Sequence, residues 1–255
     1  MSKPGLDKQL AEYLVSYGDE TAQKDYLVEA VNYGMNNSDM DFNENSSLLP
    51  VDLDWTDPDD EVLYDPDYLT VYQPYQDAQT WPNVNSVISY KNFVPNRFKP
   101  GTTKVEKCFV LAKEQLGKNG YTAGGYQLSQ IFQTYTASSG TDMNQTKRAV
   151  TYLITKLSAG VPVLAGVDVR SGSPNEDNTT DHFIVIVGMG TDSKGRYFSF
   201  YNSSTNWPIY GASKENKLYY NSNTGRISGK TMSQYGSIQG HHDFVLTQVR
   251  KSILK

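Results

Sequence analysis

The feature that most constrains the fold is the run Phe-Ile-Val-Ile-Val at residues 183–187, which is apolar on both faces of an extended chain. A strand of this kind must be covered on both sides, so the run predicts the central strand of a layered protein. His182 stands immediately before it, although the 255-residue chain has only three histidines. A loop carbonyl often satisfies a histidine at a strand end, but an ionisable ring in this position is also a candidate for chemistry.

Two segments in the second half of the chain have the apolar spacing of helices. Thr103-Lys-Val-Glu106 fits a capping box, and the residues that follow it, up to glycines 117 and 120, predict a helix with Cys108 in its second turn. Residues 144–159 predict a second helix, whose apolar residues form one stripe.

The rest of the chain after residue 160 has the composition of strands and turns. The predicted strands are residues 161–169, 183–188, 197–201, 217–221, 226–229 and 243–249. Helices followed by a meander of strands indicate an α+β fold, in which N-terminal helices pack on a central antiparallel sheet.

Charge divides the chain into two parts. Residues 25–90 contain 14 acidic and no basic residues, whereas residues 91–255 contain 20 basic and 10 acidic residues. We predict an acidic N-terminal extension over residues 1–90, made of two short helices and a wrapping segment rich in Pro, Asp and Tyr, and a folded domain over residues 91–255. Their opposite charges favour a cover-like arrangement of the extension on the domain.

Composition excludes several classes of protein. No apolar run approaches the roughly 20 residues of a membrane helix, and no apolar signal segment begins the chain, so we expect a soluble protein that is cytoplasmic or exported by a non-classical route. A single cysteine excludes a disulfide framework and a Cys-rich zinc site. No cofactor, metal, membrane or nucleic-acid partner is expected, because basic residues are scattered and the acidic cluster at 52–61 lacks the spacing of a calcium loop.

The turn after the central strand predicts a partner for His182. If the loop is centred near Asp192, residues whose numbers sum to about 384 face each other, so Asn202 is expected beside His182 on the same face. An amide beside an imidazole would orient it as a base. Asn202 also begins an ordinary turn sequence, and a register error of one residue would separate the two side chains.

Cys108 is the only thiol that such a base could activate. Near the start of a helix, main-chain N–H groups favour a thiolate, and an imidazolium partner lowers the thiol pKa further. The alternatives are that Cys108 is a small hydrophobic residue of the core, and that His241 or His242, next to Asp243, is the base instead of His182.

Cysteine, histidine and asparagine in this order resemble the site of the papain-like cysteine hydrolase superfamily, particularly its C39-like peptidase branch. The resemblance is carried by Glu106-Lys-Cys-Phe-Val-Leu-Ala112, Gly160-Val-Pro-Val163, Asp181-His-Phe-Ile-Val-Ile-Val-Gly188 and Phe198-Ser-Phe-Tyr-Asn202. It covers residues 91–255 and implies that this part is a catalytic domain. It also implies that Cys108 is the nucleophile, His182 the general base and acid, and Asn202 the residue that orients the imidazole.

The sequence departs from the family pattern at the oxyanion donor. Thr102 stands where papain-like enzymes often have a glutamine, six residues before the cysteine, so the main-chain N–H of Cys108, the hydroxyl of Thr102 or Thr103, or Asn96 must take that part. The resemblance implies a thiol-dependent peptidase or amidase, and the basic domain suits anionic cell-wall peptides of the kind that a bacterial toxin or effector cleaves. The alternatives are a non-catalytic binding module with the same fold, and an acyltransferase or deamidase that uses the same three residues.

Overall fold

The structure, a computed structural model, describes residues 71–125, 128–169, 177–232 and 242–255. The chain divides into two compact units, and the one described below consists of Tyr72–Gly125 and Ile131–Lys255. The helices predicted at 5–17 and 20–33, the acidic cluster at 52–61 and His241 lie outside the described residues.

All paired strands in the described residues are antiparallel, and most of those predicted are present. The strands are β1 Tyr121–Ala123, β2 Ile131–Gln133, β3 Tyr135–Thr136, β4 Gly140–Thr141, β5 Val163–Asp168, β6 His182–Asp192, β7 Gly195–Tyr201, β8 Lys217–Tyr220, β9 Ile227–Thr231, β10 His242–Arg250 and β11 Ser252–Leu254. The helical elements are η2 Tyr90–Asn92, α3 Cys108–Gly117, η3 Leu128–Gln130, α4 Met143–Ser158 and α5 Pro208–Gly211. No helix within the described ranges has the length and apolarity needed to cross a membrane.

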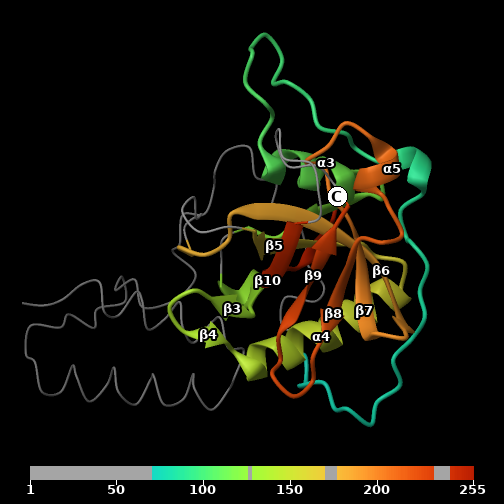
Figure 1. Cartoon of the computed structure of the whole chain (residues 1–255), viewed down its shortest axis with the longest axis vertical. Helices are drawn as coiled ribbons and strands as arrows, with labels where there is room; N and C mark the ends of the chain where they lie inside the picture. Colours follow the sequence, from blue (N-terminus) through green and yellow to red (C-terminus); the bar gives the residue numbers. More distant parts are fainter. Residues whose placement is uncertain (1–70, 126–127, 170–176, 233–241) are drawn as a thin grey trace, which may run out of the picture. The chain divides into compact units, whose positions relative to one another are not determined.

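The central antiparallel sheet closes on itself, a feature that the predicted packing of N-terminal helices on a central antiparallel sheet did not include. The strand order is β2-β10-β5-β6-β7-β8-β9, and β9 also pairs with β10 (Figure 1). One edge of β10 pairs with β9 and the other edge with β5, and Val245 pairs with both, so six strands form a barrel. A bulge between Leu246 and Gln248 shifts the register of β10 against β5. The fold is α+β with a barrel core and few helices.

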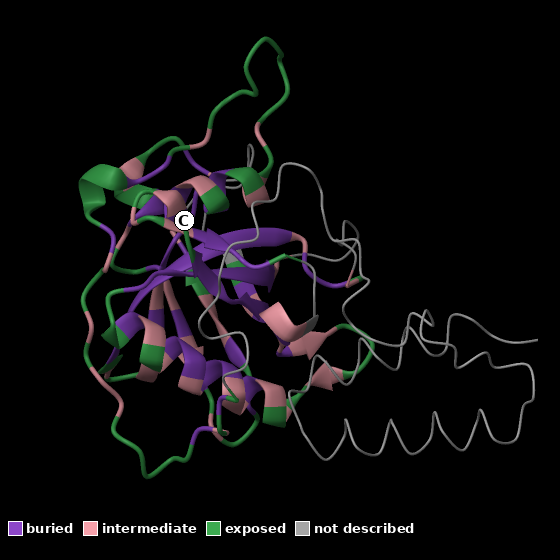
Figure 2. Cartoon of the chain, turned by 180° about the vertical axis from the view of Figure 1, so that it is seen from behind, coloured by how far each residue is buried: buried purple, intermediate pink, exposed green. Residues whose placement is uncertain are grey.

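Alternation along the strands divides their apolar side chains between two cores. Ile184 and Ile186 of β6 pack with α4, whereas Phe183, Val185 and Val187 of the same strand pack with α3. Both faces of β6 are therefore covered, as the apolar run predicted (Figure 2). Helix α4 begins one residue before its predicted start, where the Asp142 carboxylate accepts the N–H of Gln145 as an N-cap.

The predicted capping box before Cys108 is wrong. Helix α3 begins at Cys108 itself, with Lys107 as its N-cap residue. The residues before it form a protruding hairpin, in which Phe98 bridges to Val105 and the N–H of Thr102 donates to Lys99 O. Pro100 and Gly101, whose φ is 72°, supply the tight turn of that hairpin, so Thr103 cannot begin a helix.

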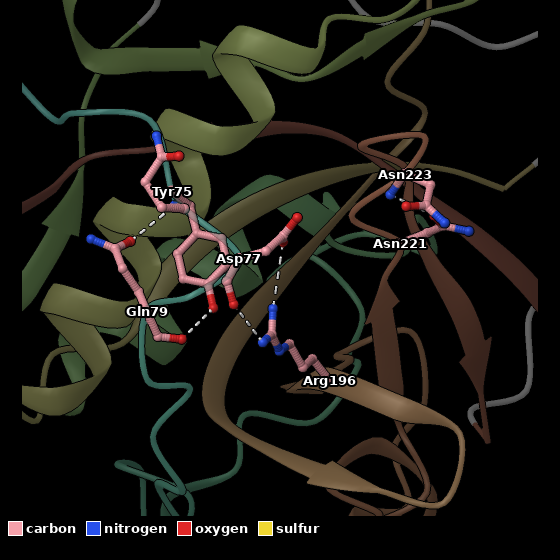
Figure 3. Close-up of polar contacts among 7 residues, drawn as sticks. Tyr75, Asp77, Gln79, Arg196, Asn221 and Asn223 are labelled. Atoms are coloured by element: carbon pink, nitrogen blue, oxygen red, sulfur yellow. Dashed lines mark hydrogen bonds and ion pairs between the residues drawn. The ribbon is translucent and has the colours of Figure 1, made fainter.

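Residues 72–90, which the sequence analysis assigned to the acidic extension, pack on the same unit as the barrel. Tyr75 is buried, and its hydroxyl donates to Gln79 O, 3.0 Å away. Arg196 of β7 lies over the rings of Tyr75 and Trp81. It also donates to Asp77 O at 3.0 Å (Figure 3). A cation held by two rings and a carbonyl fastens this segment to the barrel wall.

Replacing Tyr220 with phenylalanine is expected to stabilise the protein by about 1 kcal/mol at neutral pH. The Tyr220 hydroxyl is buried and has no hydrogen-bond partner among the described residues. Burial, followed by the Asp77 carboxylate, raises its pKa from 10.0 to about 12. Since the folded state keeps this proton while the unfolded state loses it, the wild type should lose stability as the pH rises from 10 towards 12.

Urea unfolding of the wild type and of Tyr220→Phe at pH 7 and pH 11 checks both parts of this prediction. The stability difference between the two proteins should widen at pH 11 in favour of the variant. A variant that is less stable than the wild type at pH 7 would show that the hydroxyl makes a favourable contact.

Candidate active site

The structure brings together His182 and Asn202, two of the three residues proposed for the site. The Nε2 atom of His182 lies 2.8 Å from Oδ1 of Asn202, and both residues are buried. His182 begins β6 and Asn202 follows the last residue of β7, so the pair lies at one end of this hairpin. Because both side chains are buried, water does not compete for this hydrogen bond.

Neighbouring groups fix the direction of this hydrogen bond. The main-chain N–H of Ser204 donates to Asn202 Oδ1 at 3.0 Å, and Asn202 Nδ2 donates to the Thr231 hydroxyl at 3.1 Å. Because Oδ1 is an acceptor only, His182 must donate to it from Nε2. In a neutral imidazole this leaves the lone pair on Nδ1, the form that can take a proton from a nucleophile.

A bulge in β6 puts the two side chains on one face, and it corrects the predicted register. Gly188 pairs with Ser199, but Ile186 pairs with Phe200, so the sum of paired residue numbers changes from 387 to 386 across Val187. The expected sum was 384. Continuing the observed register places Asn202 opposite Ile184, on the same face as His182. Without the bulge Asn202 would oppose Val185, whose side chain packs with α3 on the other face of the strand.

Cys108 lies at the same end of β6, on the helix that covers its outer face. The Phe109 ring packs edge-on against the Phe183 ring at a centroid distance of 4.9 Å, which fixes the start of α3 against the strand. The Cys108 thiol also has a main-chain hydrogen bond with Phe183, the residue after His182. The sole thiol of the chain is thus placed beside the main chain of the strand that begins with the imidazole.

The environment of Cys108 favours the protonated thiol. Burial raises its pKa above the usual 9.0, and the Asp181 carboxylate adds a smaller effect in the same direction. Main-chain hydrogen bonds with Phe183 and Phe109 oppose this rise without cancelling it. The expected lowering of the thiol pKa at the helix start is therefore wrong, because removal of water outweighs these main-chain contacts.

The candidate oxyanion donors differ in whether they already have a hydrogen-bond acceptor. The Thr102 hydroxyl donates to Lys99 O within its own turn, at 3.0 Å. Asn96 donates from Nδ2 to Ser204 O at 3.2 Å, and its main-chain N–H donates to Thr205 O. The first main-chain N–H groups of α3, beginning with that of Cys108, have no acceptor within the helix. They offer the donor closest to the thiol.

A cavity of about 230 Å³ opens between the hairpin that precedes Cys108 and the segment that follows Asn202. Its lining residues are Asn96, Arg97, Phe98, Val105, Ser204, Thr205 and Asn206. The Oδ1 atom of Asn96 is buried and has no hydrogen-bond partner among the described residues. Most of the lining residues are polar, and Phe98 and Val105 supply the apolar part, so the cavity can take both the polar main chain and an apolar side chain of a bound peptide.

Two residues behind Asn202 were not identified from the sequence. Thr231 ends β9, and Asn216 lies just before β8; both side chains are fully buried and hydrogen bonded to each other. A threonine in a strand and an asparagine in a turn are ordinary residues for those positions, so the sequence carries no signal for their contact. Within the described ranges, no group of three His, Cys, Asp or Glu side chains could hold a metal ion.

A comparison with protein families agrees with this arrangement. Residues 104–228 match the model of the Peptidase_C39 like family, a match that begins in the hairpin before α3, ends in β9 and includes all three proposed site residues. Neither the curated proteins nor the solved structures contain a significant match to the chain. The match over residues 104–228 therefore supports a place for this part of the chain in the C39-like peptidase branch of the papain-like cysteine hydrolases.

Proposed function

We propose that this protein is a thiol-dependent hydrolase that cleaves a peptide or amide bond through an acyl-enzyme. The observation that carries the proposal is the buried hydrogen bond from His182 Nε2 to Asn202 Oδ1, because it holds the imidazole in the form that can accept a proton at Nδ1. Cys108 begins the helix packed on the same strand. Because α3 covers the face of β6 that carries Phe183, whereas His182 shares the other face with Ile184, the thiol has to meet the imidazole around the start of the strand.

In the proposed first step, Cys108 Sγ attacks the carbonyl carbon of the scissile bond. The thiol proton passes to His182 Nδ1 as the carbon–sulfur bond forms, since the raised pKa of the thiol disfavours a preformed thiolate. The carbonyl oxygen becomes an oxyanion, which accepts hydrogen bonds from the main-chain N–H groups at the start of α3. His182 then gives its proton to the leaving amine, and the carbon–nitrogen bond breaks.

In the second step, water attacks the thioester. His182 takes a proton from the water, the carbon–sulfur bond breaks, and the proton returns to Cys108. Throughout both steps Asn202 accepts the Nε2–H hydrogen bond and so stabilises the positive charge that develops on the ring. No cofactor or metal enters this scheme.

Two observations support a peptide as the substrate. The cavity beside the segment that follows Asn202 combines the polar residues Ser204, Thr205 and Asn206 with the apolar side chains of Phe98 and Val105, as a peptide group and its side chain require. The hairpin before Cys108 also exposes Arg97, Lys99, Lys104 and Lys107. This charge favours an anionic peptide, for which a bacterial cell-wall stem peptide is one source and a toxin or effector role one context.

Incubating the full-length protein with a mixed peptide pool tests the proposal, with Cys108→Ala as the matched control. We expect products from the wild type and none above background from the variant, because the alanine removes the only group that can form the acyl-enzyme. Mass spectrometry of the acid-quenched wild type should detect an acyl adduct on Cys108. Equal product formation by both proteins would refute the proposal.

The burial of the Cys108 thiol favours one alternative, a non-catalytic binding module with the same fold. A binding module would retain peptides without cleaving them and would form no adduct on Cys108. An acyltransferase would form the adduct but pass the acyl group to an added amine. Product analysis with and without that amine separates hydrolysis from transfer.

A further inference from the structure

We infer that Thr231 and Asn216 are positioning residues, which act through Asn202 to fix the tautomer of His182. The inference rests on the proposed function of the His182–Asn202 pair and extends it to two side chains from other strands and turns. A one-way chain of hydrogen bonds runs from Asn216 through Thr231 and Asn202 to His182. All four side chains are at most 1% exposed.

The chain is anchored at Asn216, whose amide has only one possible orientation. Its Nδ2 donates to the main-chain oxygens of Tyr210 and Gly211, at 2.9 and 3.1 Å. Its Oδ1 accepts the main-chain N–H of Met232 at 2.6 Å. Reversing the amide would set donor against donor and acceptor against acceptor in a fully buried site, so the orientation is fixed by the main chain.

The fixed orientation of Asn216 determines which way the Thr231 hydroxyl donates. Since Asn216 Oδ1 can only accept, the Thr231 hydroxyl must donate its hydrogen to it, across 3.3 Å. The hydroxyl oxygen is left with lone pairs alone, and one of them accepts from Asn202 Nδ2 at 3.1 Å. Asn202 therefore keeps Oδ1 turned towards His182.

The orientation of Asn202 has a chemical consequence for the imidazole. If its amide were reversed, Nδ2 would face His182, and the ring would have to accept at Nε2 and carry its proton on Nδ1. In that form His182 could not take the proton of Cys108. Thr231 shares this task with the Ser204 N–H, and removing its hydroxyl should lower the preference for the productive orientation by roughly tenfold, the value of one buried hydrogen bond.

The experiment measures solvent exchange of the His182 Nε2 proton by NMR in the full chain carrying Cys108→Ala. This background performs no acyl chemistry, so a failure here is distinct from a failure of the proposed function. Thr231→Val should accelerate exchange by roughly tenfold, whereas Thr231→Ser, which keeps the hydroxyl, should leave it unchanged. The main-chain N–H of Ile184 serves as the internal control, because general loosening of β6 would accelerate it as well.

Unchanged Nε2–H exchange in Thr231→Val, or equal acceleration at Ile184, would overturn the inference in favour of a structural role. Thr231→Ala replaces the valine variant if that one does not fold, with the same expectation. In the background with Cys108 restored, Thr231→Val should lower kcat roughly tenfold and Thr231→Ser should restore it.

Discussion

Replacing His182 with alanine is expected to slow alkylation of Cys108 by iodoacetamide by on the order of 1,000-fold at pH 7, a loss typical of a missing general base. The reason lies in the thiol itself, since burial raises its pKa above 9.0 and leaves little thiolate at neutral pH. An imidazole that takes the proton during attack removes this limitation. The rate of carbamidomethylation by iodoacetamide, followed by mass spectrometry at the single cysteine, measures the effect.

The pH dependence should differ between the two proteins. In the wild type the rate should depend only weakly on pH near neutrality, because the imidazole takes the thiol proton during attack and no preformed thiolate is needed. In His182→Ala the rate should rise about tenfold per pH unit up to and beyond pH 9, where the thiol itself ionises. The two curves are expected to converge at high pH.

His241→Ala and His242→Ala are the matched controls, because these residues are the alternative bases. Both variants should react with iodoacetamide like the wild type. A wild-type rate in His182→Ala, or a loss of rate in either control, would assign the base elsewhere and remove the basis of the proposed mechanism.

The sequence was sufficient to predict most strands of the barrel, because their apolar residues follow local patterns. The run at residues 183–187 predicted a strand covered on both faces, and β6 has that property. The strands predicted at 217–221 and 226–229 are also present, as β8 and β9. In both cases the signal lies within a few residues along the chain, where strand alternation and turn residues act.

The contact between His182 and Asn202 was expected from the correct hairpin but from an incorrect register. The predicted register differs from the observed one, and the two side chains share a face because of the bulge at Val187. A valine between isoleucine and glycine carries no distinctive signal for a bulge. Pro100 and Gly101, in contrast, did carry a signal for the turn that rules out the capping box before Cys108.

Closure of the barrel could not be predicted, because it depends on contacts between distant strands. β9 and β10 pair across residues that are more than ten positions apart in the chain. The hydrogen-bond chain from Asn216 to His182 likewise joins residues on or beside four different strands, β6 to β9, so its members meet only when these strands pack together. Local patterns specify the strands, and long-range packing assembles the candidate site.

Gly229→Ala is expected to destabilise the protein by about 3 kcal/mol or more, the upper range for overpacking. Gly229 lies in β9 between Leu218 of β8 and Phe244 of β10. A Cβ atom at this position would lie 1.9 Å from the main-chain oxygen of Lys217 and 2.9 Å from its carbonyl carbon. These are main-chain atoms of a paired strand, so the clash cannot be relieved by a change of rotamer.

Gly160→Ala is the matched control for this substitution, and urea unfolding of both variants is the measurement. Gly160 has a φ of 79° but no atom within 4 Å of its would-be Cβ, so only the backbone conformation should cost stability, about 1 kcal/mol. Equal losses in the two variants would show that β8 and β9 can separate enough to admit a methyl group. Because Thr231 lies two residues beyond Gly229 on the same strand, Gly229→Ala should also accelerate exchange of the His182 Nε2 proton, whereas Gly160→Ala should not.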